Sequence, residues 1–339
     1  MRAIGYRHPG PIAAADALED IELPRPTPTS RDLLVGVRAV SVNPADTKVR
    51  ARAKPAEGEW KVLGFDAAGV VVETGPDVTG FKPGDEIFYA GDVTRPGTNA
   101  EYHLVDERIV GHKPRSLDWS EAAALPLTAI TAWEGLFDRL NVGRPVPGSS
   151  SILIIGGAGG VGSIAVQLAR QLTDLTVIAT ASRPETRDWV RELGAHHVLD
   201  HSKPLSAEIT AANLEAPGFV FSTTHTDAHL PEIEKLIAPQ GRFVFIDDSA
   251  SLDIVPFKRK SVSVHWEFMF TRPMFNTADV AEQGRLLDQV AKLIDAGMVR
   301  TTLSERFGPI NASNLARAHA LLESDKARGK IVLEGFEAG

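Results

Sequence analysis

The sequence predicts an α/β protein in two parts, a doubly wound parallel sheet and a β-rich domain. Three observations carry this prediction. Short apolar strands alternate with helical patterns through the middle of the chain, extended segments broken by Pro and Gly precede them, and a glycine-rich turn joins one middle strand to a helix. The 339 residues, 43% of them hydrophobic, suffice for two ordinary cores.

The chain up to residue 126 consists of short extended pieces. The clearest are DLLVGVRAVSV (32–42), AAGVVVETG (67–75) and GDEIFYAG (84–91). Their composition and their Pro and Gly boundaries are typical of strands in a largely antiparallel sheet or partial barrel. We therefore expect a β-rich first domain.

The middle of the chain predicts six strands, at 151–155, 176–180, 196–199, 218–222, 242–246 and 261–268. Helical patterns occupy four of the five gaps, for example 161–172 and 184–193. Repeated strand-helix-strand units imply a parallel sheet buried on both faces, which explains its continuously apolar strands. Two further helices (280–296 and 314–323) and a strand at GKIVLEG follow and could complete the first domain. The predicted domains are 1–126 with 271–339, and 127–270.

The glycine-rich turn is typical of dinucleotide binding. Gly157, Gly159 and Gly162 fit G-x-G-x-x-G directly after a strand and at the start of a helix, with Gly160 and Val161 between them. In such a turn the first glycine permits a tight bend, the second lets the backbone approach a pyrophosphate, and the third lets helix and strand pack closely. The helix N-terminus also favours anionic phosphates.

The end of the second middle strand indicates which dinucleotide binds. An NAD site places an acid there, about 20 residues after the glycines, whereas this chain reads TVIATASRPETR. Ser182 and Arg183 could bind a 2′-phosphate through charge-assisted hydrogen bonds, with Arg187 nearby. NADP(H) is the predicted cofactor, and the alternative is that both arginines are simply solvated.

Other candidate cofactor residues follow the fourth and fifth strands. Ligands of open α/β sheets bind at the carboxyl ends of strands, where Thr223, Thr224, His225 and Asp247 stand. His225 and His229 have an i, i+4 spacing that could suit a metal. Without a carboxylate partner they fit a cofactor loop and surface pair better.

The chain resembles the medium-chain dehydrogenase/reductase superfamily along its whole length. The resemblance rests on VSVNPADTKVR, VLGFDAAGVV, FKPGDEIF, EAAALPLTAITAWEGL, the glycine loop, LIAPQGRFVFID and GKIVL. It is greatest to the zinc-independent quinone oxidoreductase branch, including bacterial proteins often labelled zinc-type alcohol dehydrogenase-like. The resemblance implies a Rossmann NADPH domain, a GroES-like partial-barrel domain, and hydride transfer between NADPH and a quinone or α,β-unsaturated carbonyl compound. It also implies that Thr131, Phe268, Phe270 and Lys330 lie around the nicotinamide half of the cofactor. The alternatives are that Thr131 faces a backbone carbonyl inside a helix and that the aromatic residues belong to the core or to a subunit interface.

The residues that bind zinc in the zinc-dependent branch are replaced in this chain. Asn43 stands where that branch has a cysteine and Phe65 where it has a histidine, and the chain contains no cysteine at all. Zinc needs three or four N, S or O donors, so we expect no metal site. Without a metal to lower the pKa of an alcohol hydroxyl, a conjugated acceptor is the more plausible substrate.

Candidate catalytic residues are few. Asn43 could donate to a substrate oxygen or the nicotinamide ribose, or could be an ordinary turn former before Pro44. Asp46 could orient Asn43, although capping of the following helix is the better interpretation. Many quinone reductases have a tyrosine shortly after the segment matching DTKVR, whereas here Trp60 is the nearest aromatic residue. The proton could then come from solvent.

Charge and patterning limit the partners. A net charge of −8, without long single-sign blocks, argues against nucleic acid or a membrane as partner. The chain has no apolar run long enough to span a bilayer and no signal core, so we expect a cytoplasmic protein. Segment 261–268 could pair across a two-fold axis in a homodimer. The alternative functions are an alcohol dehydrogenase of the same superfamily and a non-catalytic NADPH-binding protein.

Overall fold

The computed structural model describes residues 1–336 and divides them into two compact units. One unit combines Met1–Ile130 with the described residues from Phe270 onward, and the other is Thr131–Met269. The division falls inside α3 (Pro126–Trp133). Phe270 belongs to the first unit, whereas the sequence placed it at the end of the nucleotide-binding domain.

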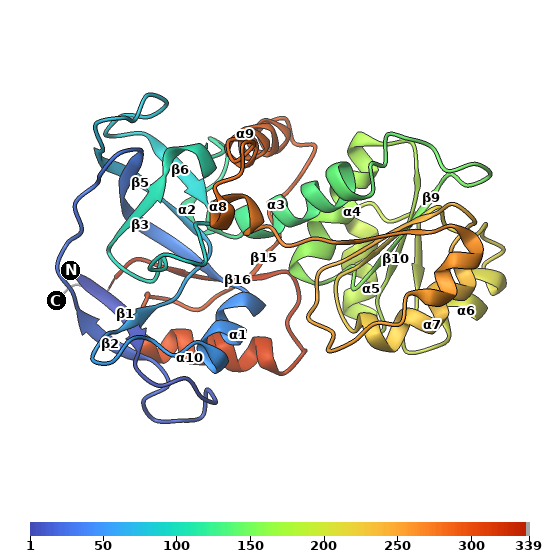
Figure 1. The fold of residues 1–339 in the computed structure, drawn as a ribbon, viewed down its shortest axis with the longest axis horizontal. Coiled ribbons are helices and arrows are strands. Elements are labelled where there is room, and N and C mark those ends of the chain that lie inside the picture. Colours follow the sequence, from blue (N-terminus) through green and yellow to red (C-terminus); the bar gives the residue numbers. More distant parts are fainter. Residues whose placement is uncertain (337–339) are drawn as a thin grey trace. The chain divides into compact units, whose positions relative to one another are not determined.

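The unit Thr131–Met269 contains a six-stranded, fully parallel sheet, and this confirms the predicted doubly wound architecture (Figure 1). The strand order is β11-β10-β9-β12-β13-β14, which is the 3-2-1-4-5-6 order of a Rossmann fold. The strands are β9 (Ser151–Ile155), β10 (Thr176–Thr180), β11 (His197–Leu199), β12 (Phe219–Ser222), β13 (Arg242–Phe245) and β14 (Ser263–Trp266).

Helices connect consecutive strands of this sheet. They are α4 (Gly160–Leu172), α5 (Pro184–Glu192), α6 (Leu205–Ala211), α7 (Thr226–Leu236) and the 3₁₀ helix η3 (Val255–Lys260), with the π-helical turn η2 (Glu134–Arg139) after α3. Helix α4 packs on β9 and β10, and the two central strands β9 and β12 are fully buried because apolar side chains cover both faces.

The other unit is built on a seven-stranded sheet of order β15-β16-β3-β5-β6-β8, with β7 also paired to β3, and a three-stranded sheet of order β2-β1-β4. Its strands are β1 (Arg2–Tyr6), β2 (Glu19–Glu22), β3 (Asp32–Val42), β4 (Lys61–Val62), β5 (Ala67–Thr74), β6 (Glu86–Tyr89), β7 (Tyr102–Asp106), β8 (Val110–His112), β15 (Leu303–Arg306) and β16 (Lys330–Glu334). All pairings except β15 with β16 are antiparallel, so this unit is the expected β-rich domain.

The C-terminal segment returns to this β-rich unit. Strand β16 pairs antiparallel with β3, with Val332 opposite Ser41, and α10 packs on α1 (Figure 1). The helices of the unit are α1 (Pro44–Arg52), η1 (Glu107–Ile109), α2 (Trp119–Ala123), α8 (Thr271–Phe275), α9 (Glu282–Asp295) and α10 (Ala312–Glu323). Within residues 1–336, no helix is both long and apolar enough to cross a membrane.

Candidate active site

A buried polar cluster lies where β3 leads into α1. Asn43 is the N-cap of α1, and its backbone N–H donates to Oδ2 of Asp46 at 2.8 Å. The other oxygen of Asp46 accepts the N–H of Gly64 at 2.9 Å. Asp46 therefore caps the helix, as the second interpretation of the sequence had it, and also fixes the turn that leads to Phe65.

The side chains of Asn43, Asp66 and Lys330 bind one another inside the β-rich unit. The ammonium of Lys330 donates to Oδ2 of Asp66 at 3.0 Å, to the carbonyl of Val42 at 3.1 Å, and to Oδ1 of Asn43. Nδ2 of Asn43 donates to the same Asp66 oxygen at 2.7 Å, and the other Asp66 oxygen accepts the N–H of Leu127 at 2.8 Å. We call Asn43, Asp66 and Lys330 the amide–ammonium cluster.

Burial dominates the electrostatics of these carboxyl groups. The amide–ammonium cluster is almost inaccessible, with exposed fractions of 1% for Asn43, 0% for Asp66 and 3% for Lys330. Burial raises the pKa of Asp66, and the nearby ammonium of Lys330 opposes that rise. Burial likewise raises the pKa of Asp46 to about 7, against its hydrogen bond from the Asn43 backbone and the charge of Lys330. The three donor positions of Lys330 are all used, so the buried charge is fully solvated by protein atoms.

Phe65 and Phe270 form an apolar contact next to this cluster. Their ring centroids are 5.2 Å apart in an edge-to-face arrangement, and both side chains are buried. As the resemblance indicated, Phe65 stands where the zinc-dependent branch has a histidine. The side chain directly before Asp66 is therefore apolar and cannot bind a metal.

The residues of this site do not fit a zinc ion. Phe65 has no donor atom, and the side-chain oxygens of Asn43 and Asp66 are hydrogen-bonded to the ammonium of Lys330. A buried cation is thus already held there by the groups that remain, and a second, divalent cation beside it would be repelled. None of the residues 1–336 forms a group of three His, Asp or Glu side chains suited to a metal.

The glycine loop between β9 and α4 has an open side and a crowded side. The only positive φ among its glycines is at Gly156 (+79°), so the tight bend lies one residue before Gly157, to which the sequence assigned it. A Cβ at Gly162 would lie 2.2 Å from the carbonyl oxygen of Gly156, which explains why helix and strand need glycine there. A Cβ at Gly159 would meet nothing closer than 3.4 Å. Helix α4 begins at Gly160, so the N–H groups from Gly160 to Gly162 lie in its first turn, where helices have no internal acceptors.

The basic residues predicted to bind a phosphate lie directly after β10. Arg183 is the N-cap of α5 and is paired with Glu185 at 3.3 Å, and Ser182 precedes it. The guanidinium of Arg187 donates to the carbonyls of Ala181 (3.4 Å) and Val198 (3.2 Å). Arg187 thus links the carboxyl ends of β10 and β11, and Arg183 lies at the same end of the sheet.

The candidate residues after β12 and β13 also lie at this edge, and several make local contacts. The hydroxyl of Thr223 donates to the carbonyl of Ile155 at 2.8 Å, and Thr224 contacts Nδ1 of His225 at 2.7 Å. Oδ2 of Asp247 accepts the N–H of Thr226 at 2.8 Å, at the start of α7. Because all strands of the sheet are parallel, these residues and the glycine loop lie together at the carboxyl ends of the strands.

The remaining predicted residues are dispersed. Thr131 is buried in α3 and Phe268 is half exposed. Lys330, expected near the nicotinamide, lies in the amide–ammonium cluster. Sequence reasoning missed Gly64, Asp66 and Leu127. The one available signal for Asp66 was its place in GFD, which matches a Gly-His-Glu segment of the zinc-dependent branch. Asp66 stands at the position of that glutamate, so a carboxylate is kept although Phe65 replaces the histidine.

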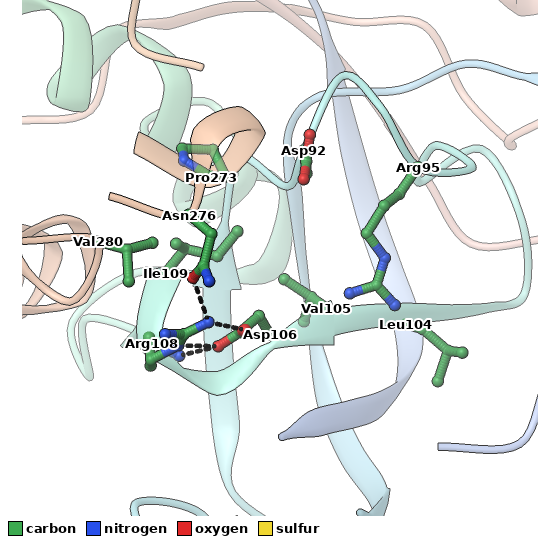
Figure 2. Close-up of a pocket in the computed structure, with 10 residues that line it drawn as sticks. All are labelled: Asp92, Arg95, Leu104, Val105, Asp106, Arg108, Ile109, Pro273, Asn276 and Val280. Carbon is green, nitrogen blue, oxygen red and sulfur yellow. Dashed lines mark hydrogen bonds and ion pairs between the residues drawn. The ribbon is translucent and has the colours of Figure 1, made fainter. Parts of the chain in front are cut away.

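A separate pocket of the β-rich unit contains none of the predicted residues. Figure 2 shows Arg108 inside it, donating to both oxygens of Asp106 and to the side-chain oxygen of Asn276. Apolar side chains such as Val105 and Val280 complete the lining. Arg108 pairs with Asp106, and Arg95 pairs with Asp32 at 2.9 Å. Both guanidinium groups thus already have carboxylate partners, which makes this pocket a weaker candidate than the carboxyl ends of the Rossmann strands and the amide–ammonium cluster.

Two family models match this chain. Residues 29–115 match the alcohol dehydrogenase GroES-like domain, and residues 193–333 match a zinc-binding dehydrogenase domain. A zinc-type alcohol dehydrogenase-like protein of Staphylococcus aureus is 40% identical over 336 residues, covering 98% of this chain and 99% of that protein. The chain belongs to the medium-chain dehydrogenase/reductase superfamily.

Solved structures of this superfamily agree with the fold. A protein of Rhizobium etli CFN 42, named as a candidate zinc-dependent alcohol dehydrogenase, is 66% identical with a TM-score of 0.98, over 100% of this chain and 99% of that one. The quinone oxidoreductase of Coxiella burnetii is 26% identical with a TM-score of 0.81, over 98% and 99%. The β-rich unit is thus a GroES-like domain and the protein is an oxidoreductase of the superfamily.

Proposed function

We propose that this superfamily member is an NADPH-dependent, zinc-independent reductase that transfers hydride to a quinone or an α,β-unsaturated carbonyl compound. The observation that carries the proposal is the amide–ammonium cluster, in which Lys330 is bound to the residues at the position of the superfamily's zinc site. Oxidation of a simple alcohol requires a lower pKa of its hydroxyl, which a bound metal supplies as a Lewis acid, so this direction is handicapped without a metal. A conjugated acceptor is already electrophilic and needs chiefly a well-positioned hydride donor.

The glycine loop and the residues after β10 would bind the cofactor. The first-turn N–H groups of α4 would donate to the pyrophosphate, and Ser182 and Arg183 to the 2′-phosphate. A phosphate dianion would compete well with the exposed carboxylate of Glu185 for Arg183, because it has the higher charge and three acceptor oxygens. When bound, NADPH would supply the hydride.

Asn43, Asp46 and Lys330 would act as positioning residues. Both ends of the Asn43 amide are hydrogen-bonded, so a substrate oxygen would have to displace Asp66 from Nδ2 to reach the strongest donor. We therefore infer that these residues fix the turns around Asn43 and Gly64 and hold Phe65 against Phe270. Because these residues act by positioning and not as acids, the proton that balances the hydride would come from solvent.

The proposed activity would be tested with NADPH and a panel of quinones and enones in the presence of a chelator. The proposal expects oxidation of NADPH that the chelator does not reduce. Strict dependence on added zinc would overturn it and would favour an alcohol dehydrogenase. Nucleotide binding without turnover of any acceptor would favour a non-catalytic NADPH-binding protein. The relation to the Coxiella burnetii quinone oxidoreductase supports beginning with quinones.

We also propose a homodimer that forms through β14, which is an edge strand. The N–H groups of Ser263 and Glu267 donate toward β13. Because successive N–H groups of a strand alternate in direction, the N–H of Val264 points away from β13, toward the unpaired side of β14. Val264→Pro should therefore halve the molar mass in solution from twice 36.5 kDa to 36.5 kDa, measured by light scattering. Val264→Ala, which loses similar packing but keeps the N–H, should remain dimeric. Equal masses for the two variants would contradict the proposed interface.

A further inference from the structure

Three histidines gather at the carboxyl edge of the Rossmann sheet. His201 follows β11 by two residues, His225 is the N-cap of α7, and His229 lies in the first turns of α7. The ring centroids of His201 and His229 are 6.2 Å apart, and the charge that His225 would carry acts on both rings. We call these three residues the imidazole cluster.

A chain of hydrogen bonds orients His201. The N–H of Gly156, in the glycine loop, donates to the hydroxyl oxygen of Thr180 at 3.0 Å, and that hydroxyl contacts Nδ1 of His201 at 3.0 Å. Thr180 is fully buried, so its hydroxyl hydrogen needs an acceptor, and Nδ1 of His201 is in place to accept it. The neutral ring then carries its hydrogen on Nε2. These hydrogen bonds link His201 to the glycine loop, and the Nε2–H donor of His201 points away from Thr180.

The charges around the imidazole cluster are mixed. Burial lowers the pKa of His201 and of His229, and the neighbouring imidazoles lower both further. Arg183 opposes protonation of His201 in the same way. Carboxylates favour protonation, and they are Asp200 beside His201, and Asp227 and Asp247 beside His229. Because both pKa values are lowered, His201 and His229 are mainly neutral at pH 7 in the absence of an anion.

We propose that the imidazole cluster completes the 2′-phosphate subsite, with Nε2–H of His201 donating to the phosphate, and that the cluster takes up one proton from solvent when NADPH binds. This inference rests on the proposed NADPH dependence. A phosphate dianion between Arg183 and the rings would stabilise a charged imidazole and so oppose the burial and the repulsion that lower the pKa of His201 and of His229. The preference for NADPH over NADH is then set by pH as well as by Arg183.

The direction of the pH dependence follows from linkage. An imidazole whose pKa rises on binding contributes affinity that is complete below its pKa in the free protein and is lost as pH rises through its pKa in the complex. NADPH affinity should therefore fall as pH rises, by up to about tenfold per pH unit where one proton is fully coupled. Above roughly pH 7 the phosphate itself is already dianionic, so its own titration does not mask the effect. NADH lacks the 2′-phosphate and should change little.

The experiment measures the dissociation constants of NADPH and NADH by calorimetry between about pH 7 and 8.5, in two buffers of different ionisation enthalpy. The wild type should take up a proton with NADPH and not with NADH. His201→Gln keeps a donor near the Nε2 position but cannot be protonated, so it should bind NADPH as the wild type does at high pH and lose the gain at low pH. His229→Gln should weaken the same gain, and His197→Gln, which alters an exposed histidine outside the cluster, should not.

The outcomes separate this inference from the proposed function. If NADPH binds no tighter than NADH at any pH, the NADPH dependence itself is wrong. If NADPH binds tightly, but proton uptake and pH dependence are the same in the wild type and in both cluster variants, the imidazole inference is overturned. Because His201 and His229 lie on different elements, misfolding of one variant leaves the other as a test.

Discussion

Lys330→Met is expected to lower the free energy of unfolding by about 3–5 kcal/mol, as seen when one partner of a buried ion pair is removed. The substitution keeps a side chain of similar length but leaves the carboxylate of Asp66, which is 0% exposed, without its cation. It also leaves the carbonyl of Val42 and Oδ1 of Asn43 without a donor. Urea unfolding followed by circular dichroism would measure the loss.

The double variant Lys330→Met, Asp66→Asn is the matched control. With the charge gone from both sides, the new amide could accept from the N–H of Leu127 and donate to Asn43, whose own amide is free to flip once Lys330 no longer binds it. We therefore expect the double variant to recover most of the lost stability. A cost below about 1 kcal/mol for Lys330→Met alone would show that the cluster is not the buried ion pair described here.

Alanine substitutions in the glycine loop should separate cofactor binding from folding. Gly159→Ala adds a methyl group with no neighbour closer than 3.4 Å, so stability should change by less than about 1 kcal/mol. NADPH affinity should nevertheless fall at least about tenfold, because the methyl group would obstruct the approach of the backbone to the pyrophosphate. Equilibrium binding monitored by nucleotide fluorescence would measure the change.

Gly162→Ala is the contrasting variant. Its methyl group would lie 2.2 Å from the carbonyl oxygen of Gly156, so it should lower stability by about 3 kcal/mol or more as well as abolish binding. Wild-type NADPH affinity in Gly159→Ala would mean that the phosphates do not approach the loop from its open side.

The Rossmann sheet could be predicted almost completely from the sequence. Strands 151–155 and 176–180 match β9 and β10 residue for residue, because both are short apolar runs bounded by turn residues. Strands such as β2, with mostly exposed residues, and β4, of two residues, were not predicted. Neither has enough apolar residues to produce a periodic pattern.

The candidate site could be predicted only where it is local in sequence. The capping contact of Asp46 with Asn43 follows from a spacing of three residues. The pairing of Lys330 with Asp66 joins positions 264 residues apart, and the sequence gives no sign of it because each residue alone could be exposed. The partners of His201 are hidden for the same reason, since Thr180 and His201 lie on different strand ends that meet only in the folded sheet.

The proposed transfer of hydride from NADPH to a conjugated acceptor without a metal can be followed with a deuterium label. Chelator-treated protein would be incubated with an enone and NADPH deuterated at C4 of the nicotinamide on the face that is transferred, and the product analysed by mass spectrometry and NMR. We expect one deuterium per product molecule, bound to the β-carbon, at a rate that added zinc does not change. A product without deuterium at that carbon, or no product until zinc is restored, would contradict it.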